Sequence, residues 1–243
     1  MNLLLRGWWW FLDYLYAGWR QILSMFKRDC PPRYAVGDPA LPAIVLLPGV
    51  YETWLFLEPS ATRLNAAGHR VYSVPGLGAN RKSIPESARI VAKRLAALHA
   101  EHSVQECILV AHSKGGLIGK HIMLDALAAL ETETLGSHPV QKLGLVAIGT
   151  PFSGSIYAKY TLSRTIRDFS PTDVVLLALT AQEKLNDRIV SIYPTFDPHI
   201  PGGSALLGAL NIELPVAGHF RTLREEVVLD AVDQSVGKLA ARD

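Results

Sequence analysis

The segment from Cys107 to Ile118, Cys-Ile-Leu-Val-Ala-His-Ser-Lys-Gly-Gly-Leu-Ile, constrains this chain more than any other. A run of apolar residues leads into Ser113, and two glycines follow before an amphipathic stretch begins. This order predicts a strand that turns sharply at the serine into a helix, because Ala111 and Gly115 are small enough for the strand and the helix to pass. Such a turn would raise the serine hydroxyl above a sheet and aim the first N–H groups of the helix toward it.

Across residues 43–240, short apolar runs alternate with longer amphipathic stretches, which is typical of a mostly parallel sheet flanked by helices. The expected strands are Ala43–Leu47, Arg70–Val74, Glu106–Ala111, Lys142–Ile148, Arg188–Tyr193 and Asn211–Leu214. The expected helices are Leu57–Ala67, Ile84–His102, Gly115–Leu130 and Leu223–Ala240. Ser83 and Glu86 have the spacing of a capping box at a helix start. The fold class is therefore α/β.

The composition of the chain excludes several classes of protein. With 243 residues, of which 49% are hydrophobic and 19% charged, the chain can bury a sizeable core and is not intrinsically disordered. A net charge of +2 is too small for a nucleic-acid binder that neutralises phosphates. Its two cysteines, Cys30 and Cys107, cannot form a disulfide framework or a four-ligand zinc site. We expect Cys107 to be a buried thiol and the protein to be cytoplasmic.

A serine hydroxyl becomes a strong nucleophile when a histidine removes its proton and a carboxylate orients that histidine. After a strand–serine–helix turn these residues follow in the order serine, acid, histidine. His219 lies in a loop between the last expected strand and the last helix, which favours it as the base over His138 and His199. Asp197 follows the end of the preceding expected strand and is the expected orienting acid. The competing acids lie before that strand, on stretches expected to be solvated: Asp168, Asp173, Glu183 and Asp187.

Two backbone N–H groups are expected to hold a developing oxyanion. One is the N–H of Lys114, directly after the nucleophile. The other is the N–H of Val50, because Gly49 lets the chain bend after the first expected strand. An ordinary strand-to-helix turn is the alternative for the segment around Val50. This set of groups needs no metal or cofactor.

These segments together resemble the α/β-hydrolase fold, and within it the small lipases and esterases, across residues 42–240. The pieces that carry the resemblance are Leu47–Val50, Ala111–Gly116, Gly149–Ser155, Tyr193–Pro198 and Gly218-His219. Two residues depart from the family pattern: Pro48 stands where a histidine is usual, and Lys114 stands where methionine, glutamine or leucine is usual. The Lys114 side chain would either favour acidic substrates or phospholipid head groups, or point to solvent.

The resemblance also implies a small helical cap, inserted at about residues 153–187, where no strand is expected. Thr161–Arg167 and Thr172–Leu185 are the expected cap helices. The apolar residues of the second helix could line an acyl pocket or pack onto the body; they are Val174, Val175, Leu176, Leu177 and Leu179.

The N-terminal segment, residues 1–30, forms a separate amphipathic unit, followed by a proline-rich linker at 31–42 and the hydrolase domain at 43–243. Arg6, Asp13, Arg20 and Lys27 recur every seven residues and form one polar stripe on an apolar helix that holds four of the five tryptophans. Three interpretations stay open: anchoring of residues 3–26 at a membrane surface, docking onto the body or a partner, and a membrane span. An acid near the bilayer centre disfavours the span.

The resemblance implies a serine hydrolase that cleaves carboxylic esters of apolar acyl groups, small-molecule or lipid, through an acyl-enzyme on Ser113. A thioesterase, amidase or acyltransferase would use the same residues, and a non-catalytic membrane-associated binding protein could have the same fold. The N-terminal helix would hold the protein peripherally at the inner membrane surface. The natural substrate and the oligomeric state stay open.

Overall fold

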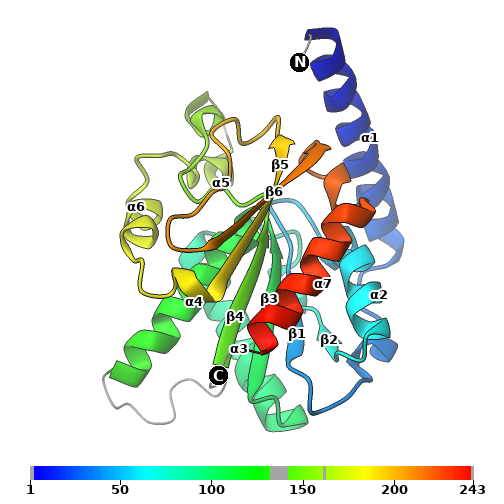
Figure 1. Cartoon of the computed structure of the whole chain (residues 1–243), viewed down its shortest axis with the longest axis vertical. Coiled ribbons are helices and arrows are strands. Elements are labelled where there is room, and N and C mark those ends of the chain that lie inside the picture. The colour runs from blue at the N-terminus through cyan, green and yellow to red at the C-terminus, as the bar shows by residue number, and fades with distance from the viewer. Residues whose placement is uncertain (1–2, 132–141, 161–162, 242–243) are drawn as a thin grey trace.

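The computed structural model describes residues 3–131, 142–160 and 163–241, and within these ranges it has one six-stranded parallel sheet (Figure 1). The strands are β1 (Ala43–Leu47), β2 (Val71–Tyr72), β3 (Glu106–His112), β4 (Lys142–Ile148), β5 (Ile189–Phe196) and β6 (Leu210–Ala217). Their order is β2-β1-β3-β4-β5-β6, and every neighbouring pair is parallel. All six expected strands are therefore confirmed, although β2 is short and β5 and β6 continue beyond their expected ends.

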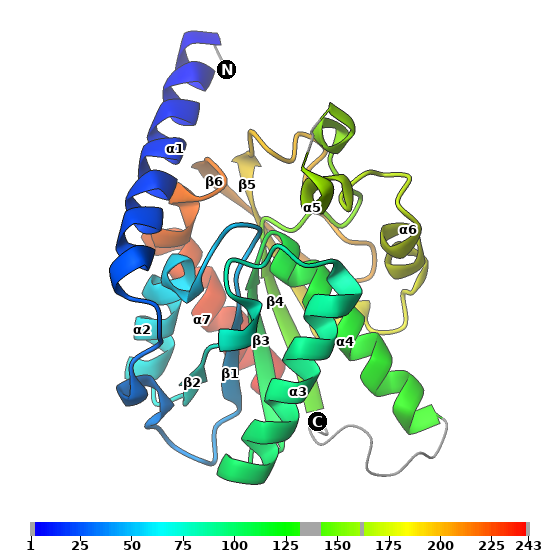
Figure 2. The same cartoon turned by 180° about the vertical axis from the view of Figure 1, so that it is seen from behind.

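Helices cover both faces of the sheet. They are α1 (Leu3–Phe26), α2 (Glu58–Ala66), α3 (Ile84–His102), α4 (Lys114–Glu131), α5 (Arg164–Arg167), α6 (Val174–Ala181) and α7 (Glu226–Ala240). Figure 1 shows α7 across one face, with α2 beside it, and Figure 2 shows α3 and α4 across the other. The expected capping box is present at the start of α3, where Ser83 and Glu86 exchange hydrogen bonds.

The apolar strands build a core on each side of the sheet because successive side chains point to opposite faces. In β1, Val45 packs in the cluster with α3 and α4, whereas Ile44 and Leu46 pack in the cluster with α2 and α7. The expected thiol at Cys107 is buried in the first cluster, and burial raises its pKa to about 12. Because all six strands run parallel, the loops after β1, β3, β5 and β6 leave the sheet at the same edge, its carboxyl edge.

The α1 helix lies beside α2 and α7, with its N-terminal turns extending past the sheet (Figure 1). The middle of its polar stripe faces inward: Asp13 is fully buried, and Arg20 pairs with Glu58 of α2 at 2.8 Å. The ends of the stripe, Arg6 and Lys27, are exposed. Many of its aromatic and aliphatic side chains face outward, and five are more than half exposed: Trp8, Phe11, Leu15, Trp19 and Ile22. Docking onto the body is therefore observed, and it uses the face that carries Asp13 and Arg20 together with the buried Tyr16. Among the described residues, no helix combines the length and apolarity needed to cross a bilayer.

The segment between α1 and β1 packs against the body over part of its length. Pro32–Ala35 forms a short 3-10 helix, and its Tyr34 is buried. The Tyr34 hydroxyl hydrogen-bonds to the Thr62 hydroxyl at 2.8 Å. Residues 31–42 thus include a packed segment in addition to the expected extended linker.

The insertion before β5 contains short helices, as expected. Some of its apolar residues are buried and others are exposed. Leu176 and Leu179 of α6 are buried in the core with α4, whereas Val174 and Leu177 are exposed. For the two buried leucines, the interpretation as packed core is the one that the structure supports. Of the earlier candidates, His138 and the first residues of the expected helix Thr161–Arg167 lie outside the described residues.

Candidate active site

Ser113 occupies the predicted sharp turn between β3 and α4. Its φ is +51°, in the left-handed region that L-residues rarely adopt, and its N–H donates to the Ile148 carbonyl oxygen at 2.9 Å. A Cβ on Gly115 would lie 1.9 Å from the Leu47 carbonyl oxygen, and one on Gly116 would lie 2.1 Å from Thr150 Oγ1. The two glycines are therefore required by close packing of α4 against β1 and the loop after β4.

His219 and Asp197 lie together at the carboxyl edge of the sheet. The Nδ1 of His219 lies 2.7 Å from Asp197 Oδ2, and Asp197 Oδ1 accepts the N–H groups of His199 at 2.8 Å and Ile200 at 3.0 Å. Burial disfavours charge on both side chains, but their mutual attraction is stronger, so the pKa of Asp197 is lowered and the pKa of His219 is raised. The predicted acid and histidine thus form a hydrogen-bonded, oppositely charged pair when His219 is protonated.

A cavity of about 250 Å³ contains both Ser113 and His219. Val50, the expected oxyanion residue, lines the same cavity. The apolar wall comes from Ile166 and Phe169 of the cap together with Tyr14 of α1. The loops after β1, β3 and β6 therefore converge on one cavity that is partly open to solvent.

The loop after β1 is held by a buried pair of side chains, Glu52 and His112, that the sequence did not indicate. Glu52 accepts the Gly49 N–H at 2.7 Å and lies 2.7 Å from Nδ1 of His112, the residue before the candidate nucleophile. The other ring nitrogen of His112 lies 3.1 Å from the His219 carbonyl oxygen. Both ring nitrogens therefore lie within hydrogen-bond distance of oxygen atoms, one on the loop after β1 and one on the loop after β6. Glu52 lies shortly after the first expected strand, and His112 lies directly before the turn at Ser113. These positions are the only features of the sequence that could have indicated the pair.

The side chain of Lys114 leaves the site, so the expectation that it points to solvent is wrong. It is fully buried, and its Nζ donates to the carbonyl oxygens of Asn80, at 3.1 Å, and Lys82. Burial lowers the pKa of Lys114 to about 8. The Lys114 side chain is thus bound to backbone carbonyl oxygens of the loop before α3 and does not line the cavity that contains Ser113, so it does not face a substrate there either.

His199 belongs to the site although the sequence analysis set it aside as a base. Its ring stacks on Trp10 of α1, with centroids 5.5 Å apart, and lies 5.0 Å from the His219 ring. Burial, with the adjacent His219, lowers the pKa of His199 to about 4, so the ring is neutral near pH 7. Its buried Nε2 has no hydrogen-bond partner within the described part of the chain and lies on a residue that lines the cavity.

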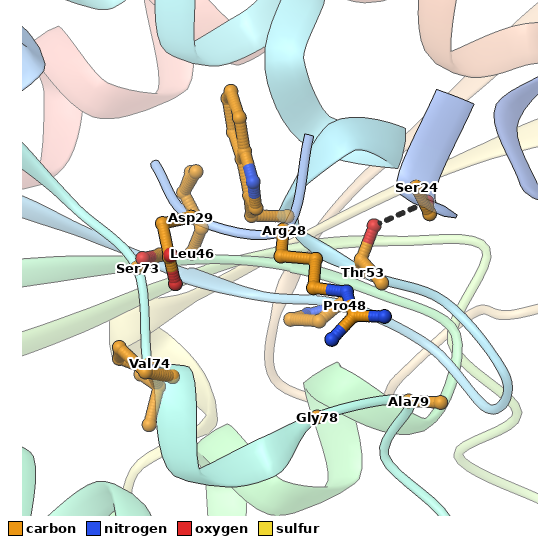
Figure 3. Close-up of a pocket in the computed structure, with 12 residues that line it drawn as sticks. Ser24, Arg28, Asp29, Leu46, Pro48, Thr53, Ser73, Val74, Gly78 and Ala79 are labelled. Atoms are coloured by element: carbon orange, nitrogen blue, oxygen red, sulfur yellow. Dashed lines mark hydrogen bonds between the residues drawn. The ribbon is translucent and has the colours of Figure 1, made fainter. Parts of the chain in front are cut away.

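A second cavity, of about 360 Å³, lies at the C-terminal end of α1 (Figure 3). Arg28 and Ser73 are among the residues that line it, and Ser24 hydrogen-bonds to Thr53 at its edge, 2.7 Å between the hydroxyl oxygens. Its lining contains neither Ser113 nor His219, although it reaches Pro48 at the base of the loop after β1. It is therefore distinct from the candidate site. Within the described ranges, no three metal-ligating side chains converge at either cavity or elsewhere.

Comparison with known proteins finds similarity at the level of structure only. No family model and no curated protein sequence matches the chain. Among solved structures, a Bacillus licheniformis lipase in its mature form superposes with a TM-score of 0.62 at 16% identity, over 82% of this chain and 94% of the lipase. Aspergillus fumigatus lipase B superposes with a TM-score of 0.61 at 14% identity, over 85% of this chain and 58% of that one. A carboxylesterase of the thaumarchaeon Nitrososphaera gargenis superposes with a TM-score of 0.52 at 13% identity, over 84% and 92%.

Proposed function

From the α/β-hydrolase fold that these likenesses establish, we propose that this chain is a serine hydrolase that cleaves carboxylic esters of apolar acyl groups. The observation that carries the proposal is the buried hydrogen bond between His219 and Asp197 at the wall of the cavity that contains Ser113. A serine on a left-handed turn, a histidine and an orienting carboxylate are the groups that acyl transfer to serine requires. The similar lipases and carboxylesterase support an ester as the bond cleaved.

In this proposal Ser113 Oγ attacks the ester carbonyl while His219 Nε2 takes the hydroxyl proton. Asp197 keeps the proton on His219 Nδ1 and stabilises the imidazolium. The backbone N–H groups of Val50 and Lys114 donate to the oxyanion. His219 then gives the proton to the departing alcohol, which leaves an acyl-enzyme on Ser113. Water, deprotonated by His219, attacks that acyl group, and collapse of the second tetrahedral intermediate releases the acid and restores the serine hydroxyl.

The cavity favours a small apolar acyl group. Its volume of about 250 Å³ lies below the usual range for ligand pockets, about 300–1,000 Å³. Ile166 and Phe169 supply apolar surface, and His199 Nε2 is a buried polar atom without a partner among the described residues that could bind a substrate oxygen. We expect short acyl chains to be enclosed and longer chains to extend out of the cavity.

The test is labelling of the full chain with a fluorophosphonate, followed by hydrolysis of short-chain and long-chain ester substrates. Ser113→Ala should abolish labelling and hydrolysis, whereas Ser153→Ala, which alters an exposed serine, should change neither. Labelling that persists in Ser113→Ala would exclude this serine as the nucleophile. A thioesterase, amidase or acyltransferase would show faster turnover of a thioester, an amide or an alcohol acceptor in the same panel. Absence of labelling in the unaltered chain would favour a non-catalytic binding protein.

The outward face of α1 supports a further element of this proposal, action at a lipid surface. Trp8, Phe11 and Leu15 are each more than half exposed, and the exposed cations Lys27 and Arg28 follow the helix. Tyr14, also on α1, lines the cavity that holds Ser113. An apolar, tryptophan-rich face with basic neighbours suits the interface of an anionic bilayer, and that bilayer would then lie beside the entrance to the site.

This element is tested by sedimentation with vesicles of phosphatidylcholine and phosphatidylglycerol. Replacing Trp8, Phe11, Leu15 and Trp19 together by serine should abolish sedimentation while hydrolysis of a soluble ester continues. Replacing Val174 and Leu177, exposed apolar residues of α6, by serine is the matched control and should sediment as before. Equal sedimentation of both variants would exclude α1 as the lipid-binding face. Dimerisation of the unaltered chain, lost in the α1 variant alone, would identify a second copy as the occupant instead.

A further inference from the structure

One carboxylate of α1 binds the backbone of the loop that carries His219. Asp13 Oδ2 accepts the His219 N–H at 3.0 Å, and Asp13 Oδ1 accepts the N–H groups of Phe220 and Arg221, both at 2.8 Å. Three consecutive N–H groups thus point at a single side chain from the opposite end of the chain. A carboxylate that accepts several backbone N–H groups forms strong, charge-assisted hydrogen bonds.

The residues around Asp13 leave room for its carboxylate and shield it from water. The residue is fully buried, so its charge has exchanged water for these N–H groups. Gly218, directly before the histidine, has a φ of +116°, and a Cβ there would lie 2.8 Å from Asp13 Oδ1. Glycine at this position therefore provides both the backbone conformation and the room that the carboxylate needs.

Helix α1 also contacts the loop on the opposite side of the cavity. The Gln21 side-chain amide donates to the Tyr51 carbonyl oxygen, in the loop that carries Val50. Tyr51 has a φ of +61°, an unfavourable conformation for a residue with a side chain, which contacts of this kind help to maintain. The same helix thus holds both the loop with the histidine and the loop with the expected oxyanion donor.

We propose that Asp13 is a positioning residue for catalysis, which fixes the His219 backbone so that the imidazole stays between Asp197 and Ser113. This inference rests on the proposed function. Asp13 touches no reacting atom, and it acts through the three N–H groups and through its negative charge beside the imidazole. In support, burial lowers the pKa of His219, the Asp197 contact more than compensates, and the Glu52 and Asp13 carboxylates raise the pKa further.

The experiment compares Asp13→Asn with Glu58→Gln in the full chain. Asparagine keeps the shape of the side chain, but its NH₂ group meets a backbone N–H and cannot accept it. Asp13→Asn should lower kcat by about 10- to 100-fold with KM changed less than threefold, as expected for a misplaced base. Glu58→Gln weakens the contact of Arg20 on the same face of α1 but leaves the His219 loop untouched, and should keep kcat within threefold.

A second readout does not depend on turnover. In a Ser113→Ala background, the His219 pKa measured by NMR should fall when Asp13→Asn is added, because a nearby negative charge is removed. The Nδ1–H signal of His219 should also broaden. Neither change should appear with Glu58→Gln. Asp13→Ser, whose hydroxyl accepts one N–H, provides the same comparison if the asparagine variant does not fold.

An unchanged kcat and an unchanged His219 pKa in Asp13→Asn would overturn the positioning role. A loss of kcat with an unchanged pKa, equal to the loss in Glu58→Gln, would reduce Asp13 to a docking contact and also overturn it. If the unaltered chain has no hydrolytic activity, the proposed function fails, while the NMR comparison still decides whether Asp13 positions the histidine.

Discussion

The imidazole rings of His112 and His219 lie with their centroids 4.6 Å apart, and Nε2 of His112 is 3.1 Å from the His219 carbonyl oxygen. The residue before the candidate nucleophile therefore contacts the main chain of the candidate base. Since Glu52 binds His112 and the Gly49 N–H, one buried cluster connects the loops after β1, β3 and β6. Its contacts fix how those loops sit relative to one another, and Glu52 also lines the cavity that contains Ser113.

Breaking the buried Glu52–His112 pair should destabilise the fold. Glu52→Gln and His112→Gln should each lower the free energy of unfolding by about 2–4 kcal/mol, because each leaves a buried polar or charged partner unmatched. The double variant should lose at least about 1 kcal/mol less than the sum, since the two side chains share one interaction. Urea denaturation of the three variants measures this coupling. Strict additivity would mean that the pair is not coupled in solution.

Asp197→Asn should lower kcat by about 10³- to 10⁴-fold with little change in KM, because the amide can no longer hold the His219 proton on Nδ1 or stabilise the imidazolium. Steady-state kinetics on a soluble ester measure both constants. Asp173→Asn is the matched control: Asp173 caps α6 by accepting the Leu176 N–H, which asparagine also does. A loss of less than tenfold in Asp197→Asn would assign the orienting role to another group.

The pH profile of kcat/KM should have an acid limb above the ordinary histidine pKa of about 6.5. Only neutral His219 accepts the serine proton, and its pKa is raised because Asp197 outweighs the effect of burial. The same shift means that His219 stabilises the fold below its unfolded-state pKa and loses this contribution as pH rises through the higher folded value. His121→Gln, which removes a histidine paired with Asp125 on α4, should leave the limb unchanged. A limb at or below pH 6.5 would contradict the assignment of the base.

Lys114→Met should change how stability depends on pH. The folded pKa of about 8 lies below the unfolded value of about 10.4, so the unfolded chain binds more protons between these limits. The unaltered chain should therefore gain roughly 1–3 kcal/mol relative to the variant as pH rises from about 8 to about 10. Urea denaturation across this range measures the difference. A constant difference between the two proteins would show that the Lys114 pKa is ordinary.

Gly115→Ala should destabilise the protein by more than about 4 kcal/mol, or prevent folding, because the added Cβ would lie 1.9 Å from the Leu47 carbonyl oxygen. Gly237→Ala in α7 is the matched change, since a Cβ there meets nothing within 4 Å. That variant should be more stable by about 0.5–1 kcal/mol, owing to the better helix propensity of alanine. Thermal unfolding of the two variants checks both expectations, and equal stability would contradict the close packing at Gly115.

The sheet could be predicted because its strands are apolar on both faces and are separated by amphipathic stretches. This alternation is typical of a parallel sheet covered by helices on both sides. The Asp197–His219 pair could be predicted as well, since both residues follow strand ends that parallel topology brings to one edge. The turn at Ser113 follows from its small neighbours. These parts of the structure depend on local pattern and chain order.

The other contacts at the site leave no local pattern in the sequence from which they could be predicted. Glu52 and His112 meet across 60 residues, and no spacing rule connects them. The seven-residue recurrence in α1 correctly defined two faces, but periodicity does not say which face meets the body. The sequence therefore left membrane anchoring, docking and a span open, and the structure shows that Asp13 and Arg20 are buried. The Lys114 side chain was misjudged because carbonyl acceptors from a distant loop cannot be identified from sequence.

Asp13 and His219 stand 206 positions apart, so a helix early in the sequence and a loop late in it meet at the candidate site. During translation, α1 emerges long before the loop that its acid will bind, and a nascent chain lacks these contacts until residues 219–221 have been made. A change that disturbs either segment should then produce the same defect. An affinity tag fused near the first turns of α1 could impair turnover as directly as one that disturbs the last loop, so expression designs should compare both placements.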